Sequence, residues 1–285
     1  VVNLKNDSMK ARHWLNVMKV TGVQFDVSLK SLTLGGVFEM ELHKYAADIE
    51  EIINESAQEA KIENELGKIE ITWRDNTLKV MKHRRDGAEK GLILQPAEDL
   101  NMELEDNMLN LQTIGASRFV GIFIDQVKKW EKALNIVAEC LEVWFQVQRK
   151  WAYLEGIFIG AEDIRLQLPE EAKRFDGIDK AFKAIMTATA KNPNVVDACT
   201  TNDRLDTLTK LGERLDSCQK SLSDYLDTKR AAFPRFFFIS DDELLSVLGS
   251  SDPTAIQIHL LKLFDNVKQL TFGRNNKIVE AMTSS

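Results

Sequence analysis

The stretch FVGIFIDQVKKWEKALNIVAECLEVWFQVQRKWAYLEGIF, residues Phe119–Phe158, decides the fold because its apolar residues recur at steps of three and four. This seam consists of Phe123, Val127, Trp130, Leu134, Val137, Leu141, Trp144 and Trp151, with Gln148 as its single polar position. The spacing predicts one uninterrupted helix over 119–158, on the order of 50 Å long. Such a wide apolar stripe is typical of a helix packed inside a bundle, so we expect other helices to lie against it.

The composition is that of a folded and mainly helical protein. The 285 residues are 44% hydrophobic and 28% charged, and they include only 14 Gly and 5 Pro, which favours long helices. The formal net charge is -7, with acidic and basic residues interleaved, which argues against nucleic acid as the main partner. The apolar run Phe236–Ile239 is far shorter than the ~20 residues that a membrane span needs. Three widely spaced cysteines (Cys140, Cys199 and Cys218) indicate reduced thiols in a cytosolic compartment.

The first part of the chain, residues 1–115, is predicted to contain N-terminal helices and a hairpin. The stretch MKARHWLNVMKVTG predicts a short helix closed by Gly22, and a second helical seam runs from Phe38 to Trp73. Two short apolar runs flank the charged link HRRDGAEKG, which contains Asp86-Gly87, and predict a β-hairpin near residues 77–95. Ser117 is predicted to cap the long helix that follows.

The second part, residues 116–285, is predicted to be a helical bundle built on the long helix. Helical stripes run from Phe175 to Ile185 and from Leu205 to Leu226, and Asn192-Pro193-Asn194 forms a turn between them. Asp252-Pro253 is expected to begin one more helix. The expected fold class is therefore mainly α: an elongated multi-helix bundle with one small β-hairpin.

The segment KRAAFPRFFFISDDELL, residues 229–245, is the least ordinary part of the chain. Pro234 is expected to stop the preceding helix, and Phe236–Ile239 to form a short, buried, strand-like run. Arg235, between the proline and this run, is predicted to be a buried, paired guanidinium. Ser240 and Glu243 have the spacing of a capping box.

The residues that could carry chemistry do not assemble into a site. The sequence has no GxxxxGK[ST] phosphate loop and no GxGxxG motif. The four histidines lack metal-ligand spacing, so we interpret them as solvated or core residues. Core packing explains the tryptophans of the long helix better than a ligand cage does, and capping explains Asp241-Asp242-Glu243 better than metal binding does. We expect no catalytic residue, cofactor or metal site in this chain.

Residues 229–245 resemble the KR-x-x-FPRF-x-F-[LI]-S-[ND]-[DE]-ELL stretch of dynein heavy chain linkers. Other motifs agree in order along nearly the whole chain: RHW at 12–14, SLTLG at 31–35, WEK at 130–132, VQRKWAYLE at 147–155, LPEE at 168–171 and DYL at 224–226. The residues at these motif positions are similar to those of axonemal dyneins. The resemblance assigns a structural role to its motif positions Trp130, Trp151, Phe233, Pro234, Arg235, Phe236, Ser240 and Glu243.

The resemblance implies a mechanical function. In dyneins the linker is a helical arm that lies across the ring of AAA+ modules, bends and straightens with nucleotide state, and delivers the power stroke along microtubules. Residues 1–285 would be a partial linker and no enzyme, since the first AAA+ module and its phosphate loop are absent; ATP and Mg would belong to the parent motor. The implied partners are the AAA+ ring of the same heavy chain and, indirectly, microtubules, with no nucleic acid or membrane. The implied location is the cytoplasm and cytoskeleton, in the axoneme of a cilium or flagellum.

Two other classes of function stay open. A passive helical spacer of the spectrin type should show repeated three-helix units, and the sequence has no internal repeat at a fixed period. An enzyme with a site assembled from distant residues is disfavoured because no acid, base or nucleophile is clustered in the sequence.

Overall fold

The computed structural model describes residues 7–24, 41–85, 87–160, 162–250, 252–274 and 278–284. The SLTLG stretch at 31–35, the start of the second seam at Phe38 and the turn residue Asp86 lie outside these described residues. The chain forms two compact units built from interleaved segments: Val1–Asn76 with Glu98–Asn135, and Thr77–Ala97 with Ile136–Ser285. The hairpin belongs to the second unit, and the long helix supplies residues to both units.

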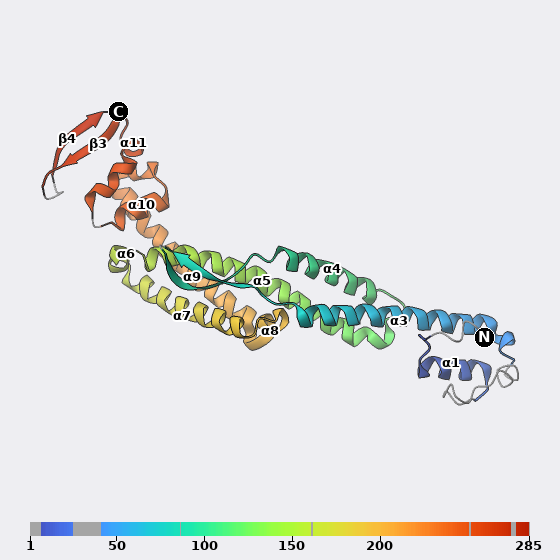
Figure 1. The fold of residues 1–285 in the computed structure, drawn as a ribbon. Helices are drawn as coiled ribbons and strands as arrows, with labels where there is room; N and C mark the ends of the chain where they lie inside the picture. Colours follow the sequence, from blue (N-terminus) through green and yellow to red (C-terminus); the bar gives the residue numbers. More distant parts are fainter. Residues whose placement is uncertain are drawn as a thin grey trace. The chain divides into compact units, whose positions relative to one another are not determined.

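The first unit is helical, and α3 is its central element (Figure 1). Helices α1 and α4 both pack against α3. Its described elements are α1 (Ala11–Thr21), the 3-10 helix η2 (Leu42–Tyr45), α3 (Ala46–Asp75), α4 (Glu98–Gly115), the 3-10 helix η3 (Gly121–Phe123) and the first part of α5 (Ile124–Phe158). The core of the unit consists of apolar side chains that are at most 1% exposed: Val17, Leu66, Ile69, Trp73, Leu111, Val127 and Leu134.

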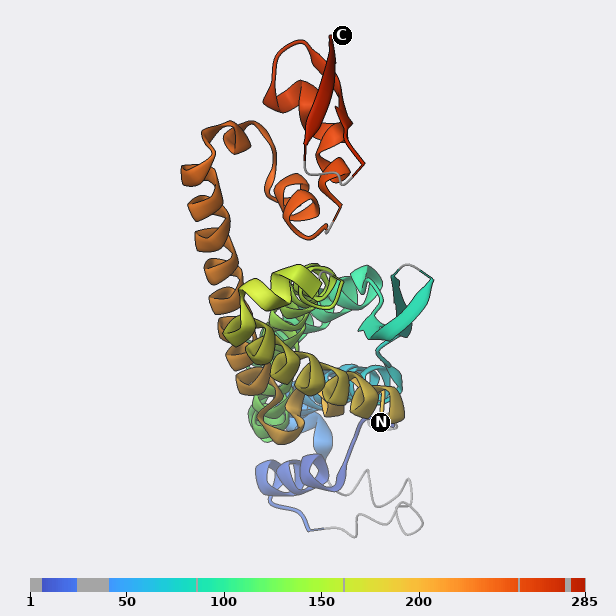
Figure 2. The ribbon, with the colours of Figure 1, turned by 90° about the vertical axis from the view of Figure 1, so that its left-hand side faces the viewer.

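The second unit carries the hairpin on a group of helices (Figures 1 and 2). Its elements are β1 (Val80–Arg85), β2 (Ala88–Leu94), the remainder of α5, α6 (Glu162–Gln167), α7 (Pro169–Lys191), α8 (Val195–Thr200), η4 (Thr201–Asp203), α9 (Arg204–Ala232), η5 (Pro234–Phe238), α10 (Asp241–Leu248), η6 (Pro253–His259), α11 (Leu260–Leu263), β3 (Val267–Phe272) and β4 (Val279–Ser284). Fully buried aromatic side chains fill its core: Trp144, Trp151, Phe158, Phe175 and Phe182. The Trp151 ring stacks on Phe182 at 4.7 Å, which ties α5 to α7.

Several local predictions are confirmed. Strands β1 and β2 pair antiparallel, with Val80 opposite Leu94 and Arg85 opposite Ala88. Helix α1 ends at Gly22, whose φ of 72° is the left-handed conformation that glycine adopts without a steric penalty. The Ser240–Glu243 capping box is present at the start of α10.

The long helix begins later than predicted. Helix α5 starts at Ile124, after the 3-10 turn η3, so Ser117 does not cap it. The Ser117 hydroxyl instead accepts a bond from the Phe119 N–H at 3.3 Å, which shapes the turn before the helix. The end of the helix, at Phe158, agrees with the prediction that Gly160 would stop it.

The mainly α fold class is confirmed, but one local prediction near the C-terminus was wrong. The run Phe236–Ile239 is not a buried strand, because Pro234–Phe238 form the 3-10 helix η5 and Phe237 and Phe238 are each 66% exposed. A second hairpin, β3–β4, follows in addition to the one that was expected. In the described part of the chain, no helix has the length and apolar character required to cross a membrane.

Candidate functional site

The hairpin β1–β2 is attached to α5 through Gln148, the polar position in the apolar seam. The Gln148 Oε1 accepts the Leu94 N–H at 2.7 Å, and its Nε2 donates to the Leu94 carbonyl at 3.0 Å. The side-chain amide thereby pairs the backbone N–H and C=O of Leu94, as the backbone of a neighbouring strand would do. The polar residue in the seam is thus the point at which the helix binds the hairpin.

A second attachment joins the end of β1 to the next turns of α5. The carboxylate of Glu155 is 1% exposed, and Arg85 Nη1 lies 3.0 Å from its Oε2 and 3.3 Å from the Ala152 carbonyl. Gly156 makes room for this guanidinium, since a Cβ at Gly156 would lie 1.7 Å from Arg85 Nη1. The His83 ring packs edge-on against Trp151 at 5.3 Å from the same side. These contacts compensate a buried carboxylate and fix the hairpin's orientation.

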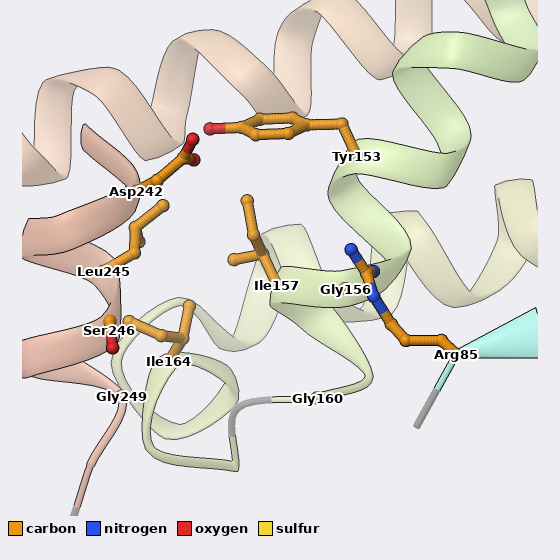
Figure 3. Close-up of a pocket in the computed structure, with 10 residues that line it drawn as sticks. All are labelled: Arg85, Tyr153, Gly156, Ile157, Gly160, Ile164, Asp242, Leu245, Ser246 and Gly249. Atoms are coloured by element: carbon orange, nitrogen blue, oxygen red, sulfur yellow. The ribbon is translucent and has the colours of Figure 1, made fainter. Parts of the chain in front are cut away.

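Beside this attachment lies a cavity of about 420 Å³ within the second unit, between α5, α6 and α10 (Figure 3). Ile157, Ile164 and Leu245 form its apolar wall, and the Tyr153 hydroxyl points toward the Asp242 carboxylate across it. Burial, followed by the charge and hydrogen bond of Asp242, raises the pKa of Tyr153 to about 12. The phenol therefore stays protonated at neutral pH and connects α5 to α10.

The FPRF segment forms an aromatic corner after α9, and Arg235 is placed differently from our prediction. Its side chain is exposed, not buried in an ion pair. Arg235 Nη1 donates to the Leu263 carbonyl at 2.8 Å, and the guanidinium lies 4.7 Å from the Phe264 ring centroid. Phe233, 37% exposed, packs edge-on against the half-buried Phe236 at 4.8 Å. Arg235 was misplaced because Pro234 starts a 3-10 turn that directs it outward to the end of α11.

The remaining motif positions have structural placements. Trp130 is half-buried on the first-unit part of α5, and Trp151 is fully buried and donates from Nε1 to Asp179 at 3.0 Å. The Glu243 side chain also pairs with Lys262 on α11. The Lys262 bond, followed by the bond from the Ser240 backbone, lowers the pKa of Glu243 to about 2. The capping box therefore also joins α10 to α11.

In the first unit, the RHW motif attaches α1 to α3. Arg12 Nε donates to Glu59 Oε2 at 2.7 Å, and His13 Nε2 lies 3.0 Å from the same oxygen. The Lys10 N–H donates to His13 Nδ1 at 3.0 Å, so the proton of a neutral His13 resides on Nε2 and is donated to Glu59. Trp14 is 8% exposed and adds an apolar contact.

These arrangements hold elements of each unit together. The described residues include no cluster of three potential metal ligands. All three cysteines are free and buried, and burial raises the pKa of Cys218, which disfavours a reactive thiolate. Sequence analysis missed the roles of Arg85, Glu155 and Gly156, for which the local pattern gives no signal. Gln148 did give one, as a polar residue in an otherwise apolar seam.

Comparison with known proteins agrees with the resemblance found in the sequence. A sequence profile of the family described as Dynein heavy chain, N-terminal region 2, matches residues 1–285. The chain is 53% identical over 282 residues to the dynein-1-alpha heavy chain, flagellar inner arm I1 complex, of Chlamydomonas reinhardtii, covering 99% of this chain and 6% of that protein. It is 48% identical over 288 residues to dynein axonemal heavy chain 10 of Homo sapiens, covering 100% and 6%, and 38% identical over 278 residues to the ciliary dynein beta chain of Heliocidaris crassispina, covering 97% and 6%. The chain thus spans 6% of the length of these relatives. It belongs to the dynein heavy chain family and corresponds over its whole length to the N-terminal region 2.

Proposed function

We infer that residues 1–285 are part of the linker of a dynein motor, the mechanical element that converts ATP-driven changes of the AAA+ ring into a power stroke along microtubules. The observation that carries this inference is the match of the whole chain to the dynein heavy chain N-terminal region. ATP and Mg would be bound by the parent protein, outside these residues. The names of the relatives, which include flagellar, axonemal and ciliary chains, support a location in the axoneme.

The structure of α5 suits a force-bearing element. It is a helix of 35 residues, and it contributes residues to both compact units. Its inward face is continuously buried through Leu134, Val137, Leu141 and Trp144, each at most 2% exposed. A helix supported along its length by core packing resists bending better than an isolated helix, because bending would open those contacts.

The test is Leu141→Gly in a complete heavy chain. Removing a core leucine side chain costs about 2–5 kcal/mol, and glycine in a helix adds about 1 kcal/mol. The matched control is Glu139→Gly, an exposed position on the same helix, where we expect the glycine penalty alone. We expect Leu141→Gly to shorten the displacement per stroke in an optical trap while ATP still binds, with some loss of ATP turnover through feedback from linker to ring. The control should keep a near-normal stroke.

A normal stroke in a Leu141→Gly motor that is demonstrably destabilised would contradict the lever and favour a passive helical spacer. The chain alone supplies a further test, since it contains no phosphate-binding loop. Titration calorimetry of residues 1–285 with Mg-ATP should show no saturable binding. Micromolar binding to the isolated chain would mean that nucleotide is held by residues other than those of the ring.

A further inference from the structure

The hairpin β1–β2 carries a concentration of positive charge that its attachment to α5 does not use. Residues 79–90 contain five lysines and arginines against two acidic residues, a net charge of +3 in a chain whose net charge is -7. These cations are Lys79, Lys82, Arg84, Arg85 and Lys90. Of these five residues, Arg85 forms an ion pair with the buried carboxylate of Glu155.

The alternation of β1 separates the attachment from two of the remaining cations, Lys82 and Arg84. His83 and Arg85 face α5, where they contact Trp151 and Glu155. Side chains one position away in a strand point to the opposite face, so Lys82 and Arg84 are directed away from α5. Both are exposed. In the sequence Lys82-His83-Arg84-Arg85, the second and fourth residues therefore contact α5, and the first and third present positive charge on the other face.

The exposed Lys79, Lys82 and Arg84 and the half-buried Lys90 are only partly neutralised by carboxylates of the described part of the chain. Lys82 pairs with Glu89 across the hairpin at 2.9 Å, with both side chains about half exposed. Lys79, Arg84 and Lys90 make no ion pair with the carboxylates of the described part of the chain.

The hairpin presents this charge from a fixed position. Gln148 binds Leu94 at one end of the sheet, and the Leu78 N–H donates to the Pro193 carbonyl at 2.7 Å beside it. Strand β2 packs beside α7, while β1 pairs with no described strand other than β2. The hairpin projects beside the helices of the second unit in Figure 2. A rigidly held surface loses little entropy on binding, which favours its use in recognition.

We propose that Lys79, Lys82, Arg84 and Lys90, here called the basic hairpin surface, dock onto an acidic surface of the same heavy chain outside residues 1–285. Charge complementarity selects the acidic partner. This chain spans 6% of the length of its relatives, so most of the heavy chain is available to supply that partner. The inference rests on the proposed function and deepens it by naming a contact surface of the linker.

The experiment is zero-length carbodiimide cross-linking of the complete heavy chain, followed by digestion and mass spectrometry. The reagent joins a lysine amine to a carboxylate that it contacts. We expect Lys79, Lys82 and Lys90 to be joined to carboxylates outside residues 1–285. Lys210, an exposed lysine of the same unit that pairs with Asp206 at 2.6 Å, is the internal control and should give its local link.

A charge reversal tests whether the contact is electrostatic. In the double variant Lys82→Glu with Arg84→Glu, we expect the links from Lys79 and Lys90 to the same carboxylates to fall about tenfold, because like charges then oppose docking. Lys210→Glu should leave those links unchanged. Melting curves of the variants check that the hairpin stays folded.

Three results would overturn the proposal: hairpin lysines that link outside residues 1–285 no more often than Lys210 does, links that lead mainly to a separate polypeptide, or links that survive the charge reversal. Charged side chains also protect edge strands from aggregation. Under that explanation the double variant aggregates and the wild type gives no links. The stroke assay on Leu141→Gly is independent of this experiment. If the hairpin lysines form the expected links while the stroke is normal, the proposed mechanical role is rejected and the proposed docking surface stands.

Discussion

Gln148→Leu should release the Leu94 end of the hairpin from α5, while the Arg85–Glu155 attachment and the helix itself stay in place. The Gln148 amide binds both the N–H and the C=O of Leu94, which is 2% exposed and has little access to water. Each buried backbone group that is left unpaired costs about 1–3 kcal/mol. The leucine side chain is more apolar than glutamine and returns about 1 kcal/mol at this half-buried position. We expect a net loss of about 1–5 kcal/mol, with the melting temperature falling by about 2–4 °C for each kcal/mol lost.

Gln146→Leu is the matched control, since it makes the same substitution two residues away on the exposed face of α5. Its amide makes a single 3.3 Å bond to Glu142 at the surface, so we expect little change in stability. Thermal unfolding measures the global effect. Hydrogen exchange at the Leu94 amide measures the local one, and should become at least about tenfold faster in Gln148→Leu alone. Equal melting temperatures and equal Leu94 exchange in the two variants would refute the attachment.

Two further predictions concern Arg235 and Tyr153. Because Arg235 is exposed and makes one bond to the Leu263 carbonyl and one contact with Phe264, Arg235→Ala should cost about 1 kcal/mol in urea unfolding; a loss above about 3 kcal/mol would restore the buried ion pair. The raised pKa of Tyr153 means that the unfolded chain ionises first, so its contribution is present below pH 10 and is lost as the pH rises toward 12. Stability measured from pH 8 to 11 should fall more in the wild type than in Tyr153→Phe, and parallel curves would argue against the bond to Asp242.

Local signals in the sequence predicted the main helices, the first hairpin and the caps at Gly22 and Ser240, but not the start of α5, which Ser117 does not cap. The seam of α5 is decided by spacing alone, because apolar residues three and four apart must share a face of a helix. Gly22 and the Ser240–Glu243 box act on backbone groups within a few residues, so neighbouring sequence is enough to identify them. The resemblance to dynein linkers came from such strings, and the family was confirmed. The elongated shape stays a prediction, to be tested by small-angle scattering.

The tertiary structure decided the features that depend on residues far apart in the chain. Arg85 and Glu155 are 70 positions apart, and nothing near either residue shows that they meet. Arg235 was predicted to be buried because it precedes an apolar run, but the 3-10 turn after Pro234 leaves Arg235 and two residues of that run, Phe237 and Phe238, exposed.

The second hairpin illustrates the same limit. The Gln257 side chain accepts the Leu270 N–H at 2.9 Å and donates to its carbonyl, as Gln148 does for Leu94 in the first hairpin. Short strands of this kind gain stability mainly from what covers them and pairs with them. Periodicity determined which segments are helical, while the pairing of distant polar groups, which periodicity does not encode, determined how the hairpins are held.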